Sequence, residues 1–125
     1  MTYKSSDMVK LASRGVAAVH DLTQAPSENK LLDVLFYLWN EGGKEHQATI
    51  EEITDGLAWN TTGWTDFSTH FQALVDRKYV VIVSTPKLPG WDVELSSGKI
   101  IHESVGPYDT LVQKYPLATE IRKVE

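Results

Sequence analysis

The chain has 125 residues, a formal net charge of −5 from 12 basic and 17 acidic residues, and no cysteine. The missing cysteines exclude disulfides, thiolate metal sites and cysteine catalysis, and the length fits a single domain across residues 1–125. No apolar run approaches the ~20 residues that a membrane-spanning helix needs, and Lys10 and Arg14 interrupt the apolar region of any signal peptide. We therefore expect a soluble cytoplasmic protein that does not enter membranes.

The first predicted helix covers residues 6–22. Ser5, Ser6 and Asp7 offer side-chain oxygens that can accept the unpaired backbone N–H groups at a helix start. Apolar side chains then recur at three- and four-residue spacing, at Met8, Leu11, Ala12, Val16, Val19 and Leu22. The pattern predicts an N-terminal helical arm within residues 1–26, which either packs on the domain or supports a homodimer.

Two further helices are predicted between Ser27 and Leu57. The first ends at Gly42, because glycine tolerates the left-handed backbone of a helix C-cap. Its wide apolar face consists of Leu31, Leu32, Val34, Leu35, Leu38 and Trp39. A short polar connection with an edge-strand residue or two follows. Thr49 then caps the second helix, and Glu52 three residues later completes a capping box.

A longer helix is predicted from Thr65 onward. Its inner face repeats at helical spacing and consists of Phe67, Phe71, Leu74 and Val75. The preceding residues 58–63 form a polar turn flanked by Trp59 and Trp64. These two tryptophans either fill the seam between the helices or expose an aromatic side chain for protein binding.

Strand patterns follow the helices. Residues 79–84 are rich in valine, and residues 91–96 alternate apolar and acidic side chains. We expect these two strands to form a β-hairpin across the proline-containing turn of residues 85–90. A C-terminal extension, residues 98–125, is predicted to add a short strand at residues 99–103, a helix opened by Pro107, and a last helical turn or strand.

The layout of helix, turn, helix and hairpin resembles the winged helix-turn-helix domains of bacterial and phage transcription regulators. The resemblance rests on Thr49-Ile-Glu-Glu-Ile, on His70-Phe-Gln-Ala-Leu-Val-Asp-Arg-Lys-Tyr-Val and on the hairpin after it. It implies a mainly α fold with a small antiparallel β-hairpin (α+β), in which residues 27–97 form the winged-helix core. That core should bury Leu35, Leu38, Ile53, Leu57, Phe71 and Leu74 together.

The resemblance implies a transcription regulator that binds duplex DNA, and too few cations for a monomer suggest a homodimer. In that hypothesis the helix from Thr65 reads base edges with Thr65, Thr69 and Gln72. Phosphate contacts come from Arg77, Lys78 and Lys87. Lys78 stands where the family usually has glycine, so a left-handed backbone there would be strained.

The alternative hypothesis is a protein-binding winged helix with an acidic face. Residues 49–78 contain five acidic and two basic residues, a net charge of −3, which disfavours phosphate and favours a basic protein partner. The predicted contacts are Glu51, Asp66, Asp76, Trp64 and Trp91. Such a protein would suit a phage- or plasmid-type modulator of host nucleic-acid machinery.

No catalytic, cofactor or metal site is predicted. The histidines lack the i, i+3 or i, i+4 partner of a helical metal pair. The sequence contains neither a Gly-x-Ser-x-Gly nucleophile elbow nor a glycine-rich phosphate loop. We therefore expect a binding protein rather than an enzyme.

Overall fold

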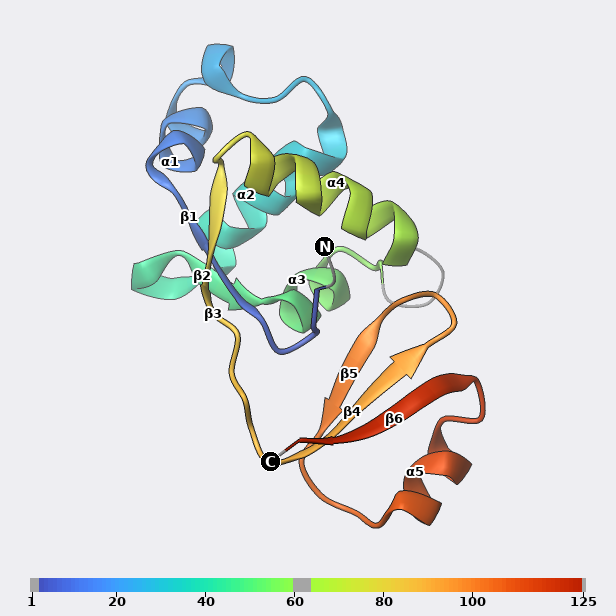
Figure 1. Ribbon diagram of the computed structural model, residues 1–125. Coiled ribbons are helices and arrows are strands. Elements are labelled where there is room, and N and C mark those ends of the chain that lie inside the picture. The colour runs from blue at the N-terminus through green and yellow to red at the C-terminus, as the bar shows by residue number, and fades with distance from the viewer. Residues whose placement is uncertain (1–2, 60–63, 125) are drawn as a thin grey trace.

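The computed structural model describes residues 3–59 and 64–124, and it is a mixed α/β fold with two antiparallel three-stranded sheets (Figure 1). The N-terminal part, residues 3–84, contains β1 (Met8–Leu11), α1 (Ser13–His20), η1 (Leu22–Gln24), α2 (Asn29–Glu41), η2 (Gly43–Glu45), β2 (Gln47–Thr49), α3 (Ile50–Gly56), α4 (Trp64–Asp76) and β3 (Val80–Ser84). The C-terminal part, residues 90–124, contains β4 (Gly90–Leu95), β5 (Ile100–Glu103), α5 (Tyr108–Lys114) and β6 (Ala118–Val124).

Helices α2, α3 and α4 confirm the three predicted central helices. The capping box is present at the start of α3, where Thr49 accepts from the Glu52 backbone N–H and the Glu52 carboxylate accepts from the Thr49 backbone N–H. The helices bury their predicted apolar faces in one core, which contains Leu35, Leu38, Ile53, Phe71 and Leu74, with Leu57 partly buried. Part of the predicted polar turn, residues 60–63, lies outside the described residues.

The prediction of one helix across residues 6–22 is wrong, because Met8–Leu11 form strand β1. This strand is the central strand of the first sheet, whose order is β2-β1-β3. It pairs antiparallel with β2 on one side and β3 on the other, so its backbone groups are satisfied at both edges. Val9 and Leu11 point into the core. Only α1 keeps the helical pattern, and its Val16 and Val19 pack against that core.

The predicted hairpin is also wrong. Strand β3 pairs with β1, whereas β4 pairs with β5 and β6 in a second sheet of order β5-β4-β6. Residues 85–89 between β3 and β4 form an extended connection instead of a turn, and prolines at positions 86 and 89 lack the N–H that a strand ladder needs. The strand at residues 100–103 and the helix after Pro107 are confirmed, and residues 118–124 form a strand.

The two parts meet at the N-terminal segment. The Ser5 backbone N–H donates to the Ile100 carbonyl at 3.0 Å, and Lys4 forms an isolated bridge with Ile100. The Lys4 ammonium donates to the Asp92 carboxylate of β4 at 2.7 Å. The segment that precedes β1 therefore ties the C-terminal sheet to the helical core.

The connection from α4 to β3 has the left-handed backbone anticipated at Lys78, whose φ is 64°. The Lys78 N–H donates to the Val75 carbonyl and the Tyr79 N–H to the Leu74 carbonyl, both at 3.0 Å, which is the hydrogen-bond pattern of a Schellman motif. Lysine carries the steric strain of this conformation, whereas glycine does not.

We expect Lys78→Gly to stabilise the protein by about 1 kcal/mol, as measured by urea denaturation. Lys78→Ala is the matched control, because alanine also lacks the ammonium but keeps the Cβ that strains the left-handed backbone. A glycine variant no more stable than the alanine variant would contradict this account of the turn.

Candidate functional site

The outward face of α4 was predicted to read DNA, and its polar groups form internal hydrogen bonds. The Gln72 amide donates to Asp76 Oδ1 at 2.8 Å, and its carbonyl accepts from the Tyr3 hydroxyl. Thr69 donates to the Thr65 carbonyl at 3.0 Å, although both threonines are exposed. Of the three predicted base-reading residues, Gln72 is therefore held in place by two partners that a base edge would have to displace.

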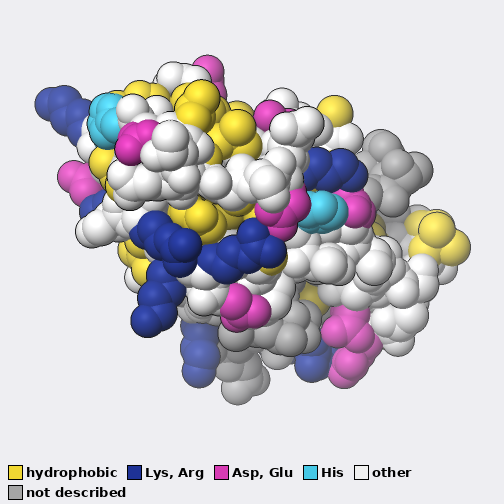
Figure 2. Space-filling view, turned by 90° about the horizontal axis from the view of Figure 1, so that it is seen from above, with side chains coloured by type: hydrophobic (Ala, Val, Ile, Leu, Met, Phe, Trp, Pro, Cys, Tyr) yellow, Lys and Arg dark blue, Asp and Glu magenta, His cyan; other side chains and the backbone are white. Residues whose placement is uncertain are grey.

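The basic residues near the end of α4 also form contacts within the protein. Arg77 pairs with Glu28 ahead of α2, with Nη2 and Oε2 2.9 Å apart. The hydrogen bond from Arg77 lowers the pKa of Glu28 to about 2. Arg14 of α1 donates to the Arg77 carbonyl at 2.8 Å and covers the Tyr79 ring. Lys78 is exposed beside them. Figure 2 views this end of the molecule and shows a group of neighbouring Lys and Arg side chains with acidic side chains at its border.

Lys87, the third predicted phosphate contact, does not lie on a hairpin tip next to α4. It belongs to the extended connection between β3 and β4 and lines a concavity of the C-terminal part together with Lys4, Arg122 and Lys123. The structure thus separates the predicted phosphate contacts into two groups, one at the end of α4 and one beside the second sheet.

Four of the five residues predicted for protein binding are occupied by internal contacts. Asp66 pairs with Lys30, whose hydrogen bond lowers the pKa of the Asp66 carboxyl, and Asp76 accepts from Gln72. Trp64 is only 6% exposed and packs on Phe67.

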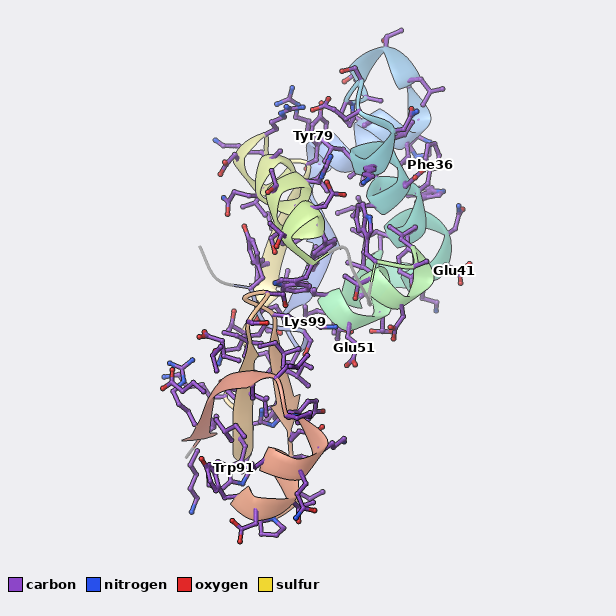
Figure 3. All side chains as sticks on the ribbon, turned by 90° about the vertical axis from the view of Figure 1, so that its right-hand side faces the viewer. Phe36, Glu41, Glu51, Tyr79, Trp91 and Lys99 are labelled. Atoms are coloured by element: carbon purple, nitrogen blue, oxygen red, sulfur yellow. The ribbon has the colours of Figure 1, made fainter. Side chains whose placement is uncertain are left out.

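Trp91 is half-buried in the C-terminal part, at the end of the molecule opposite Tyr79 (Figure 3). Its indole N–H donates to the Gly106 carbonyl at 3.1 Å.

Trp59 packs edge-on against Phe67, with ring centroids 5.1 Å apart. Trp64 is buried and Trp59 half-buried, and both pack on Phe67 of α4. Glu51 is the remaining member of the predicted protein-binding set, and it is exposed.

Glu51 belongs to an acidic surface built from the exposed sides of α2 and α3. We define this acidic face as Glu41, Glu51, Glu52 and Asp55, all of which are exposed. Figure 3 shows Glu41 at the end of α2 and Glu51 near the start of α3, both directed outward. Within residues 3–59 and 64–124, no ion pair joins Glu41, Glu51 or Asp55 to a basic side chain. Their negative charge is therefore uncompensated.

Tyr37 marks the middle of the acidic face. Burial, followed by the charges of Glu52, Glu41 and Asp55, raises the pKa of its hydroxyl, so the three carboxylates lie within electrostatic reach of one phenol. A Cβ on Gly56 of α3 would approach Tyr37 Cε2 to 2.3 Å, so glycine at this position allows the ring to lie against α3. The two helices are therefore packed closely where the charges gather.

The surrounding sequence strengthens this surface. Residues 28–59 contain seven acidic and two basic residues, and five of the acids remain when Glu28, paired with Arg77, and Glu45, paired with Lys10, are set aside. Of the four residues of the acidic face, only Glu51 is among the predicted protein-binding contacts. The available signal was the i, i+4 spacing of Tyr37 and Glu41, which places both side chains on one side of α2.

Neither a metal centre nor a membrane-spanning helix is found in the described part of the chain. No group of three His, Asp or Glu side chains is arranged to hold a metal ion there, and no helix there is long and apolar enough to cross a bilayer. Buried Asp92 pairs with half-buried His102 at 3.2 Å and with Lys4 at 2.7 Å, and His102 Nε2 is enclosed without a hydrogen-bond partner among the described residues. This pair joins the two parts of the molecule.

No protein-family model, curated protein or solved structure matches this chain.

Proposed function

We propose that this protein is an interaction module that docks on a basic protein partner through the acidic face of α2 and α3. The observation that carries the proposal is the set of exposed carboxylates of Glu41, Glu51 and Asp55, which have no basic partner in the described residues. Uncompensated charges on rigid helices attract an oppositely charged surface and accelerate its association.

The fold proposed for the N-terminal part is a variant of the winged helix. In this proposal α3 and α4 act as the helix-turn-helix pair, and β1 is the strand beside β3 in place of the predicted second hairpin strand. Domains of this kind bind proteins as well as DNA. Proteins that handle nucleic acids carry basic surfaces for phosphate, so a phage- or plasmid-type modulator of host nucleic-acid machinery fits the acidic face.

Charge reversal tests the proposed docking surface. We expect Glu51→Lys with Asp55→Lys to slow association with the partner about tenfold at low salt, because the reversal replaces attraction by repulsion. The matched control is Asp109→Lys with Glu120→Lys in the C-terminal part. Each pair changes the charge equally, and each removes one acid from the first turn of a helix. Association rates are measured by surface plasmon resonance on the partner recovered from cells.

Equal slowing by both pairs would contradict docking through the acidic face and would indicate a response to total charge. An unchanged rate for both pairs would contradict it too. The salt dependence supplies a further check, because attraction between exposed charges weakens as ionic strength rises.

Duplex DNA binding through α4 is the second candidate. The observations in its favour are the exposed Thr65 and Thr69 together with Arg14 and Lys78 at the C-terminal end of the helix. In that case the logarithm of affinity should fall with the logarithm of salt concentration, with a slope of about −0.9 per phosphate contacted. Gln72→Ala should then relax base preference.

The homodimer also stays a proposal. Removing residues 1–26 is not a suitable test, because that deletion takes away β1, the central strand of the first sheet. Sedimentation of the full chain, with and without the exposed Leu22 replaced by serine, tests whether this end of the molecule supports self-association.

A further inference from the structure

Strand β6 (Ala118–Val124) leaves one edge of the second sheet open. The strand pairs with β4 on one side, and no strand of the described chain pairs with its other side (Figure 1). At the opposite edge of this sheet, Lys4 and Ser5 meet Ile100 of β5. An open edge strand presents a row of backbone N–H and C=O groups with which another strand can pair.

Helix α5 lies on one face of the second sheet rather than over the edge of β6. Tyr108 of α5 packs on Trp91 of β4, with ring centroids 5.8 Å apart, and Lys114 donates to Glu103 of β5 at 2.9 Å. Trp91 and Glu103 are antiparallel partners and therefore share this face. The register places Ile121 of β6 on the same face.

Apolar side chains are exposed between α5 and β6. A concavity of about 350 Å³ lies there, and its lining includes Tyr108, Val112 and Ile121. Tyr108 is 50% exposed and Val112 43%. Four of the eight exposed large apolar side chains of the described residues lie at positions 105–117, so they concentrate around this helix. A contiguous group of exposed apolar side chains marks an interaction surface.

The charges of β6 are complementary to those of a second β6. When two copies pair antiparallel about Ile121, Glu120 of each copy lies opposite Arg122 of the other, and no two like charges are opposite. A shift of two residues in either direction sets two Glu120 side chains or two Arg122 side chains against each other, which is repulsive. The charges therefore favour one register of self-pairing.

Within one chain, Glu120 and Arg122 are exposed and only loosely paired. Arg122 lies 3.7 Å from the Glu120 carboxylate and 4.0 Å from that of Glu94, whereas a charge-assisted hydrogen bond spans about 2.7–2.9 Å. Natural edge strands use charge to deter pairing, but β6 carries both signs at positions that oppose each other in a self-pair. Its pairing with β4 is regular from Glu120 to Val124, so these positions lie in regular strand.

We infer that a second copy of this chain pairs antiparallel with β6 and joins the two C-terminal sheets into one continuous sheet. The two-fold axis passes beside Ile121 and places both α5 helices on one face, where the exposed Tyr108 and Val112 side chains of the two copies flank the new strand pair. Glu120 and Arg122 form two ion pairs between the copies on the other face. This interface is separate from the acidic face on α2 and α3.

The experiment measures the mass of the full chain by sedimentation over a range of concentrations. The test variants are Glu120→Arg and Arg122→Glu, each of which places like charges opposite each other in a self-pair. The edge of each variant is complementary to the edge of the other, so a mixture of the two restores the ion pairs. The matched controls are Asp33→Arg and Lys44→Glu, which make the same charge changes at exposed positions outside β6.

We expect the unmodified chain to dimerise and each test variant to raise the dissociation constant about tenfold or more, because two attractions become repulsions, while the controls stay within about twofold. An equimolar mixture of the test variants should dimerise more tightly than either variant alone. A mixture that dimerises no better than the separate variants would overturn the pairing of Glu120 with Arg122.

An unmodified chain that stays monomeric at every concentration would overturn the second copy as the occupant and leave the edge to a strand of another protein. A dimer that dissociates in Leu22→Ser but persists in both test variants would overturn the β6 interface in favour of the end at η1.

Self-pairing and docking on a basic partner fail separately. Self-pairing is measured as a mass, whereas docking through the acidic face is measured as an association rate. Glu120→Lys, which belongs to the control pair for the acidic face, should make that variant monomeric without slowing its association with the basic partner.

Discussion

Replacing Phe71 by alanine is expected to destabilise the protein by about 3–5 kcal/mol, the usual loss for a fully buried phenylalanine. Phe71 is 0% exposed at the centre of α4. Its ring contacts Tyr3 edge-on, with centroids 4.8 Å apart, and stacks on Phe67 at 5.4 Å. Truncation would leave a cavity among the N-terminal segment, α4 and the other helices, because a close-packed interior relaxes only partly. Urea denaturation measures the loss.

Phe36→Ala is the matched control. Phe36 lies on α2 but is only partly buried, and it is absent from the side chains that pack against the core cluster. The same chemical truncation should therefore cost clearly less there. Equal losses at the two positions would contradict the described orientation of α2 and α4.

The second large effect is expected at Asp92, where Asp92→Asn should destabilise the protein by about 1–3 kcal/mol. The carboxylate is 6% exposed and accepts from Lys4 at 2.7 Å, with His102 Nδ1 at 3.2 Å. Asparagine keeps the shape but removes the charge that faces the Lys4 ammonium. Because the Lys4 side chain is 27% exposed, water recovers part of the loss, so the effect should stay below that of breaking a fully buried ion pair.

Lowering the pH should remove the difference in stability between the unmodified chain and Asp92→Asn. Burial raises the pKa of Asp92, but hydrogen bonds from Lys4 and His102 outweigh burial and lower it below its ordinary value of 3.8. A carboxyl with a lowered folded-state pKa stabilises the protein above its unfolded pKa, and that stability is lost as pH falls through the folded pKa. The stability gap between the unmodified chain and Asp92→Asn should therefore be full near neutral pH and shrink below about pH 3.8. A gap that stays constant on acidification would contradict the ion pair.

The helices α2, α3 and α4 could be predicted because their information is local. Apolar spacing, the Thr49–Glu52 capping box and the turn at Lys78 all lie within a few residues of the structure they specify. Strand β1 could not, since Met8 and Leu11 fit a helical stripe as well as a strand. Its strand conformation depends on partners at residues 47–49 and 80–84, far along the chain.

The wrong hairpin has a related cause. Two strand patterns separated by a short connection predict a hairpin, but β3 pairs with β1, from the start of the chain, and β4 pairs with β5 and β6. The candidate site could be predicted only in part, because it also depends on contacts between residues far apart in the sequence. The acidic residues were visible in the sequence, but the pairings Lys30–Asp66 and Glu28–Arg77 span 36 and 49 residues. Only the fold distinguishes the neutralised acids from the uncompensated carboxylates of Glu41, Glu51 and Asp55.

The central claim, that the acidic face binds a protein, is tested most directly by purifying the full chain from the cells that express it, with and without nuclease treatment. Mass spectrometry and nucleic-acid analysis then identify what stays bound. We predict a basic protein that remains after nuclease treatment and is lost from the Glu51→Lys, Asp55→Lys variant but not from the Asp109→Lys, Glu120→Lys variant. A duplex DNA fragment that stays bound to both variants, with no protein retained after nuclease, would contradict the claim.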